Sequence, residues 1–107
     1  LLREIASRLT ATVREVDTVA RIGGDEFVVM LSAPESVEAV EGVVRRIIAE
    51  VSRPFEVAGQ LVQVGCSVGI ALYPEHGPDQ ASLLGHADTA MYVAKASGRN
   101  TYHIHVP

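Results

Sequence analysis

The stretch Arg21-Ile22-Gly23-Gly24-Asp25-Glu26-Phe27 is the most informative part of this 107-residue chain. Its two glycines permit positive φ angles and let the backbone lie close to a ligand. The flanking residues, 18–22 and 27–31, have the composition of two strands. We therefore expect a β-hairpin with its tip at residues 24–26. The second strand is apolar at every position, which is typical of a central strand that is covered on both faces.

The hairpin tip carries two adjacent carboxylates, Asp25 and Glu26. Carboxylate oxygens are the ligands that Mg²⁺ prefers, and the metal is usually shared with the phosphates of a substrate. A divalent metal there would neutralise phosphate charge and activate a hydroxyl group for attack. The alternative is an ordinary glycine turn with solvated acids, because turns favour these residue types in any case. The turn by itself leaves both interpretations open.

Hydrophobic periodicity predicts three helices, one from the start of the chain and two later ones. Ser36 and Asp79 are the expected N-caps of the later helices, Pro54 ends the second, and Gly98 suits the left-handed position after the third. The expected buried stripes are Leu2, Ile5 or Ala6, Leu9 and Val13; Val37, Val40, Val44, Ile47 and Val51; and Leu84, Ala87, Met91 and Ala94. Further strands are predicted at 55–57, 61–72 and 100–106.

This order of elements predicts an α+β domain over residues 1–107, with helices packed on a largely antiparallel sheet. In the strand predicted at 61–72, one face is apolar and should pack on helices. The other face is made mainly of small residues such as Gly65, Ser67 and Gly69, which let another group approach the backbone. Cys66 belongs to the apolar row, so we expect it in the core rather than as a nucleophile.

Composition excludes several classes of function. Thirteen acidic and nine basic residues give a net charge of −4, which argues against a nucleic-acid partner because a duplex-binding protein needs a basic face. No apolar run is long enough to span a membrane, so we expect no membrane contact from this segment. The single cysteine cannot form an internal disulfide, which favours a cytoplasmic setting, although the parent protein could be membrane-anchored. The four histidines show no metal-ligand spacing and are expected to be solvated.

Residues 21–27 resemble the signature of the GGDEF family, the diguanylate cyclases, which join two GTP molecules into cyclic di-GMP. Three further segments resemble the same family in the same order: Arg14-Glu15-Val16-Asp17, Ser67-Val68-Gly69-Ile70-Ala71, and residues 87–95 followed by Gly98-Arg99-Asn100. The resemblance covers essentially the whole chain and implies a nucleotide-cyclase or palm-like fold. Pro54-Phe55 and residues 71–74 are most similar to GGDEF domains that precede an EAL phosphodiesterase domain.

The resemblance implies a role for each residue of the hairpin tip. Asp25 would bind Mg²⁺ (or Mn²⁺) and assist deprotonation of the attacking 3′-hydroxyl group. Glu26 would support the metal and the substrate at the same tip. Gly23 and Gly24 would let the backbone lie against the nucleotide.

Two cations of the last helix are implied in binding the GTP substrate. Lys95 and Arg99 lie four residues apart on one helical face, and by resemblance they would hold the triphosphate. Their alternative role is that of solvated cations that complement the negative end of a helix.

The resemblance also implies an inhibitory site for the product, cyclic di-GMP, at Arg14 and Asp17. An Arg can bind a guanine edge or a phosphate through two hydrogen bonds, and an Asp can accept from guanine N–H groups. The alternative is a surface ion pair between residues i and i+3. Arg45 in the second helix would be a secondary contact, with Arg46 as the other candidate for that position.

The chain departs from the family pattern at its beginning. Family members start earlier, with a central strand that carries another metal-binding Asp and a helix that reads guanine. Without that strand, unpaired strand edges would lie next to the hairpin and invite pairing with another chain. We expect the chain to compensate by forming a homodimer, by swapping an element, or by rearranging its strands.

The enzymatic interpretation is a fragment of a diguanylate cyclase that acts in the intact parent and is inactive alone. The alternative is a non-catalytic module that senses GTP or cyclic di-GMP and regulates a neighbouring EAL-type phosphodiesterase domain. A structural or dimerisation domain that keeps the motif without activity is a third option. The sequence favours the first, because residues 23–27 match the signature at every position.

Overall fold

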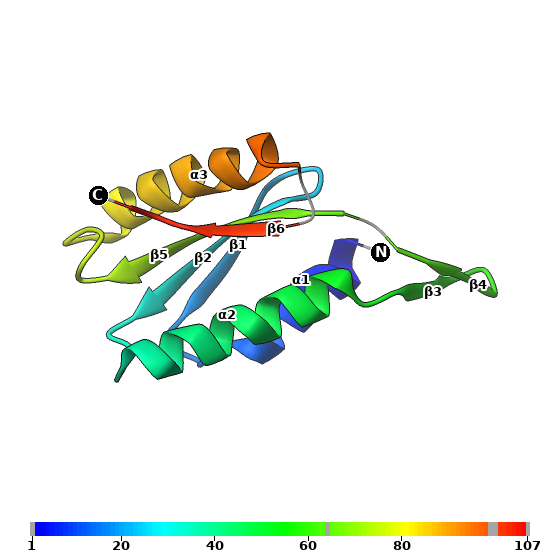
Figure 1. The fold of residues 1–107 in the computed structure, drawn as a ribbon, viewed down its shortest axis with the longest axis horizontal. Helices are drawn as coiled ribbons and strands as arrows, with labels where there is room; N and C mark the ends of the chain where they lie inside the picture. The colour runs from blue at the N-terminus through cyan, green and yellow to red at the C-terminus, as the bar shows by residue number, and fades with distance from the viewer. Residues whose placement is uncertain (1, 64, 99–100, 107) are drawn as a thin grey trace.

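The computed structural model describes residues 2–63, 65–98 and 101–106, and for Leu2 it describes the backbone only. Figure 1 shows helix α3 on one face of a sheet and helices α1 and α2 on the other, with a small hairpin projecting from one end. The elements in chain order are α1 (Leu2–Thr12), β1 (Thr18–Gly23), β2 (Glu26–Ser32), α2 (Val37–Ser52), β3 (Phe55–Val57), β4 (Gln60–Val62), β5 (Ser67–Tyr73), α3 (Gln80–Ala96) and β6 (Thr101–Ile104).

The α+β class is confirmed, but the main sheet is mixed rather than largely antiparallel. Its order is β1-β2-β5-β6, and only β1 and β2 pair antiparallel, whereas β2 with β5 and β5 with β6 pair parallel. The reason lies in the connections. A short turn joins β1 to β2, whereas α2 and α3 carry the chain back across the sheet, and a helical crossover delivers a parallel strand.

The strand expected at 61–72 is divided in the structure. β4 ends at Val62 and pairs with β3 in the separate projecting hairpin, whereas β5 begins only at Ser67. The two pieces belong to different sheets, so a single continuous strand would not reach both partners. The last strand is also shorter than expected and runs from Thr101 to Ile104; Asn100 lies outside the described residues.

Strand β2 has a hydrogen-bonded neighbour on each side. All seven of its residues are in parallel register with β5, from Glu26 opposite Ser67 to Ser32 opposite Tyr73. The expectation of unpaired strand edges beside the hairpin was therefore wrong. Three responses were expected: dimerisation, exchange of an element, and rearrangement of the strands. The structure corresponds to the third, because β2 and β5 lie side by side in the sheet. Dimerisation and element exchange stay predictions.

Two apolar layers hold the sheet between the helices. One contains Phe27, Val29, Val68 and Ile70 with the apolar stripes of α1 and α2, and the other contains Val28, Met30 and Ala71 with α3. The buried residues of α3 are Leu83, Ala87, Ala90, Met91 and Ala94. The prediction of Leu84 in this stripe was wrong, as was that of Val37 in α2, because both side chains point to solvent and are 38% and 70% exposed.

The predicted helix boundaries are confirmed. Ser36 accepts a hydrogen bond from the Ala39 N–H at 3.1 Å, and Asp79 accepts one from Ser82 at 2.8 Å. Gly98 adopts a φ of +115° after α3. Among the described residues, no helix is both long enough and apolar enough to cross a membrane.

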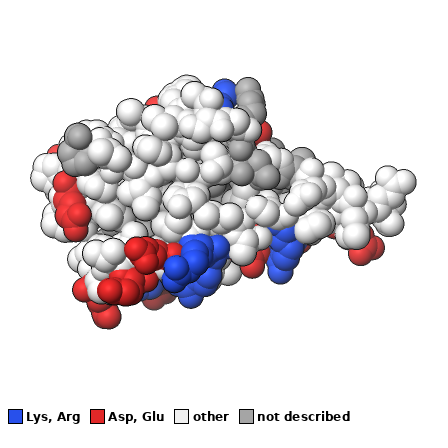
Figure 2. All heavy atoms as spheres, viewed as in Figure 1, with Lys and Arg blue, Asp and Glu red and all other residues white. Residues whose placement is uncertain are grey.

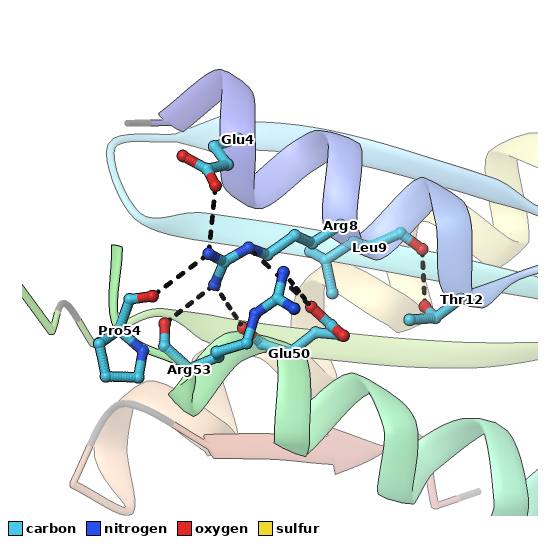
Figure 3. A network of polar contacts seen from close by, with 7 residues as sticks. All are labelled: Glu4, Arg8, Leu9, Thr12, Glu50, Arg53 and Pro54. Atoms are coloured by element: carbon cyan, nitrogen blue, oxygen red, sulfur yellow. Dashed lines mark hydrogen bonds and ion pairs between the residues drawn. The ribbon is translucent and has the colours of Figure 1, made fainter. Parts of the chain in front are cut away.

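Arg8 fastens α1 to the end of α2, as Figure 3 shows. Its guanidinium donates to the carbonyl oxygens of Arg53 at 2.9 Å and Pro54 at 3.3 Å, and to the Glu4 carboxylate at 3.1 Å. It also lies 3.7 Å from the centre of the Phe55 ring. Arg8 thus supplies donors to carbonyl groups just after the end of α2, where the helix itself provides none.

The small face of β5 is confirmed as a place of close approach, and α3 is what approaches. A Cβ atom added at Gly69 would lie 1.9 Å from the Ala87 carbonyl oxygen and 2.4 Å from the Met91 backbone nitrogen. Both are backbone atoms, so they cannot move aside without moving the helix. A glycine at position 69 therefore sets how closely α3 lies on the sheet.

We expect Gly69→Ala to lower the free energy of unfolding by at least about 2 kcal/mol, because overpacking forces backbone shifts. The matched control is Gly85→Ala, on the exposed side of α3, where an added Cβ meets no atom within 4 Å. That change should be neutral or stabilise by up to about 1 kcal/mol through helix propensity. Urea unfolding measures both, and similar effects of the two changes would contradict the close-approach argument.

Candidate functional site

The tip of the β1–β2 hairpin is a two-residue turn. Gly23 pairs with Glu26, which leaves Gly24 and Asp25 as the loop. Gly24 has a φ of +44° and thus uses the freedom that glycine provides. The Arg21 guanidinium donates from Nε to the Gly24 carbonyl oxygen at 3.0 Å and holds the turn from the side. Sequence reasoning did not assign this contact to Arg21.

The carboxylate of Glu26 is paired with Lys95 of α3. Lys95 Nζ lies 2.6 Å from Glu26 Oε2, although the two residues are 69 positions apart. The side chains are 34% and 17% exposed, so the pair is partly shielded from water. The structure therefore brings the expected phosphate-binding lysine to the hairpin tip. Arg99, expected beside it, lies outside the described residues.

Asp25 is tied to the beginning of β5 through its backbone. The Ser67 N–H donates to the Asp25 carbonyl oxygen at 3.0 Å, which extends the β2–β5 ladder to the tip. Burial raises the pKa of the neighbouring Cys66 thiol to about 12, with a smaller contribution from the Asp25 carboxylate. Cys66 is thus a protonated core residue at neutral pH, as the sequence predicted.

The donor set at the tip suits a hard divalent cation that is shared with a substrate. Asp25 and Glu26 supply two carboxylates, and Mg²⁺ is commonly bound through one or two carboxylates together with phosphate oxygens. Within the described ranges, no three metal-ligating side chains gather in one place. The two carboxylates of the tip fit a hard cation whose other ligands are phosphate oxygens and water.

Asp17 is a buried carboxylate with several hydrogen bonds. Its side chain is only 2% exposed. One oxygen accepts from the Ser32 N–H at 2.8 Å, and the other accepts from the Arg14 N–H at 2.9 Å and from Arg14 Nε at 3.3 Å. The Arg14 guanidinium also contacts the Ser32 carbonyl oxygen. The ion-pair alternative for Arg14 and Asp17 is thus present in the structure, and it joins the loop before β1 to the end of β2.

A cavity of about 520 Å³ opens next to this pair, between the loop and α2. Arg14, Asp17 and Arg46 line it, together with Ala39 and Gly42. Arg45 is not among the lining residues. The structure thus brings the alternative, Arg46, to the cavity, because Ala39, Gly42 and Arg46 recur at helical spacing on one side of α2. That spacing was the sequence signal that could have separated the two arginines.

Figure 2 shows acidic side chains gathered at the N-terminal end of α2 and basic side chains beside them. Glu35, just before the helix, also lines the cavity. The cavity lining therefore carries both acidic and basic side chains. Such a lining suits a ligand that presents both hydrogen-bond donors and anionic groups.

Comparison with known proteins places this geometry in a family. The family model described as "Diguanylate cyclase, GGDEF domain" matches residues 1–101. This chain belongs to the GGDEF family. The GGDEF chain aligns at 39% identity and a TM-score of 0.78 with a solved EAL/GGDEF domain protein from M. capsulatus, over 99% of this chain and 68% of that one.

Two curated relatives are similar over nearly the whole GGDEF chain. It is 43% identical over 102 residues to the bifunctional diguanylate cyclase/cyclic di-GMP phosphodiesterase MucR of Pseudomonas aeruginosa. It is 41% identical over 107 residues to the cyclic di-GMP phosphodiesterase PdeR of Escherichia coli. These matches cover 95% and 100% of this chain, but only 15% and 16% of the two relatives' lengths.

We expect Asp17→Asn to lower the free energy of unfolding by about 1–3 kcal/mol, because one backbone N–H would then face an amide NH₂ group instead of an acceptor. The control is Asp25→Asn, whose side chain accepts no hydrogen bond within the described part of the chain; its effect should stay within about 0.5 kcal/mol. Urea unfolding of both variants tests this. An equal effect at the two positions would show that burial of Asp17 does not stabilise the loop.

Proposed function

We propose that the chain is part of a diguanylate cyclase domain, which in the intact parent condenses two GTP molecules into cyclic di-GMP with Mg²⁺ or Mn²⁺. The observation that carries this proposal is the 2.6 Å contact between Lys95 and Glu26 at the hairpin tip beside Asp25. It joins a cation of α3 to the carboxylates of the tip, which is the set of charges that phosphoryl transfer requires.

In this proposal, the 3′-oxygen of one GTP forms a bond to the α-phosphorus of the other, and pyrophosphate leaves. Asp25 takes the proton of the attacking hydroxyl group, and a second identical step closes the ring. Lys95 binds the triphosphate by charge and hydrogen bonding. The turn at Gly23 and Gly24 lets the nucleotide lie against the backbone. The metal, held by Asp25 and Glu26 when bound, would supply neutralisation of phosphate charge.

In this proposal, substrate binding exchanges the partners of the Glu26–Lys95 ion pair. A phosphate oxygen replaces the Glu26 carboxylate as the partner of Lys95, and the carboxylate becomes available to the cation that accompanies the nucleotide. The exchange keeps both side chains paired throughout. Leaving either one unpaired in a partly buried site would be costly.

The product joins two GTP molecules, so two copies of the domain are required to present them. We infer that the parent acts as a homodimer and that the 107-residue chain alone is inactive.

A second candidate function is a sensing module without catalysis. The name of PdeR is that of a phosphodiesterase, and the match with it covers 100% of this chain and 16% of PdeR. In that case the site binds GTP or cyclic di-GMP and controls a neighbouring EAL-type domain. The two candidates share the same binding residues and differ in whether product is formed.

Activity of the intact parent separates the candidates. We expect it to form cyclic di-GMP from GTP and Mg²⁺, and Asp25→Ala to lower the rate by at least about 100-fold, which is typical for the loss of a general base. Glu56→Ala, on the exposed β3 strand, is the matched control and should keep the parental rate. Tight binding of GTP without product in the parent would instead support the sensing module.

The cavity between Arg14 and α2 is the proposed site for product inhibition. We propose that Arg14 and Arg46 contact cyclic di-GMP there and that Asp17 takes part and holds Arg14 in place. Arg45, the first candidate from the sequence, is the residue before Arg46 in α2 and serves as the matched comparison.

We expect Arg46→Ala to weaken binding of cyclic di-GMP by at least tenfold, about 1.4 kcal/mol, whereas Arg45→Ala changes it by less than threefold. Isothermal titration of the intact parent and both variants measures this. A larger effect at Arg45 than at Arg46 would place the secondary contact on the other side of α2.

A further inference from the structure

Three histidines that are far apart in the sequence meet at one end of the molecule. His76 belongs to the turn after β5, His86 to α3, and His105 follows β6. The rings of His86 and His105 are stacked, with centroids 4.2 Å apart and an interplanar angle of 11°. The ring of His76 meets that of His105 edge-on at 5.1 Å. The expectation that all four histidines are solvated was wrong for His76, which is buried.

Hydrogen bonds fix the protonation pattern of this cluster. The Leu72 N–H donates to His76 Nδ1 at 2.9 Å, so the ring must be neutral, with its proton on Nε2. The Nδ1 atom of His86 contacts the His76 carbonyl oxygen and therefore carries a proton. Next to the cluster, the His105 N–H donates to the Ile70 carbonyl oxygen at 2.9 Å and continues the β5–β6 ladder.

The cluster is not arranged as a metal site. Nearly parallel stacked rings direct their nitrogen lone pairs within parallel planes, not toward one common point. Consistent with this, the part of the chain that the structure describes contains no group of three ligands able to hold a metal. A cavity of about 460 Å³, lined also by Glu75 and Gly77, gives water access to the rings. Proton exchange with solvent is therefore open to them.

Protonation of this cluster opposes the folded arrangement. The charged groups that act on it within the described residues are Glu75, which favours the protonated form of His76, and His103 beside His105. Burial, followed by neighbouring charges, lowers the pKa of His105, and burial lowers that of His76 despite Glu75. The unfolded chain therefore binds more protons than the folded chain. The contribution of the cluster to the free energy of unfolding is fully present above pH 6.5 and is lost as the pH falls through the lowered pKa values of the two histidines.

We propose that His76, His86 and His105 form a pH-sensitive latch that holds the end of β6 against β5 and releases it on protonation. A proton on His76 Nδ1 turns the acceptor of the Leu72 N–H into a second donor. A proton on His105 places a charge against the stacked ring of His86. The second change acts beside the hydrogen bond from His105 to Ile70, and the first loosens the turn whose His76 ring packs against His105. The end of β6 then separates from the sheet while the central strands stay paired.

Hydrogen exchange at the His105 amide tests the latch in the 107-residue chain. The protection factor corrects for the intrinsic pH dependence of exchange. We expect this factor to fall at least tenfold between pH 7.5 and 5.5, because the opened form binds protons that the closed cluster excludes. The amides of β2 should change by less than twofold. A change at His105 below twofold, or an equal fall in β2, would overturn the proposal.

Variants separate the cluster from a general effect of acid. His105→Gln and, as a second route, His86→Gln keep the backbone N–H at position 105 and should reduce the fall to less than twofold. His103→Gln, in β6 two residues before His105, removes only the smallest of the causes that lower the pKa of His105 and should keep the tenfold fall. A tenfold fall that persists in both cluster variants would overturn the latch, as would its loss in His103→Gln alone.

Discussion

The parallel pairing of β2 with β5 is the constraint on which the rest of the structure depends. It begins where Ser67 donates to the backbone of Asp25 and runs in unbroken register to the far ends of both strands. Register matters because a slip of one residue would turn every side chain to the opposite face. With the register fixed, Gly69 lies under α3, and α3 in turn delivers Lys95 to the hairpin tip.

The chain uses its carboxylates in two physically distinct ways. The Asp17 side chain is almost fully buried, and both of its oxygens accept hydrogen bonds from backbone N–H groups and from Arg14, so its charge stabilises a loop. Glu26 and Asp25 lie at a partly exposed tip, and the partner of Glu26 is a flexible lysine rather than the backbone. A lysine can exchange one anionic partner for another, whereas a backbone N–H of a strand cannot leave its place. In the proposed function, this difference in partners leaves Asp25 and Glu26 available to metal and phosphate, whereas Asp17 acts at the inhibitory site mainly by holding Arg14 in place.

Local features of this fold could be predicted from sequence because short-range chemistry determines them. The turn at Gly24 and the caps Ser36 and Asp79 depend on neighbours within a few residues, and the unbroken apolar run at 27–31 is itself a local pattern. Features that depend on distant partners were predicted less well. Whether 61–72 forms one strand or two depends on which sheets its parts join, and periodicity carries no such information.

The candidate site shows the same division between local and distant information. The motif identified the tip residues, and the resemblance named Lys95, but neither contained the ion pair with Glu26, because 69 residues separate the two. Leu83 and Leu84 both fit a helical stripe with Ala87, so periodicity alone does not separate them, and only the contact with the sheet shows that Leu83 is the buried one. The histidine cluster had no sequence signal, since its members come from a turn, a helix and the end of a strand.

The two proposed ligand sites lie at opposite ends of β2, and their separation constrains how one can affect the other. Glu26 begins the strand at the hairpin tip, and Ser32 ends it against Asp17 and Arg14. Six residue steps place these ends roughly 20 Å apart. A strand that is paired on both sides cannot slide to carry a signal over that distance without breaking its register. In the proposed function, product bound between Arg14 and Arg46 therefore neither touches the hairpin tip nor shifts it along the strand. In the proposed function, inhibition must act on the placement of whole domains, because the reaction needs two hairpin tips brought face to face.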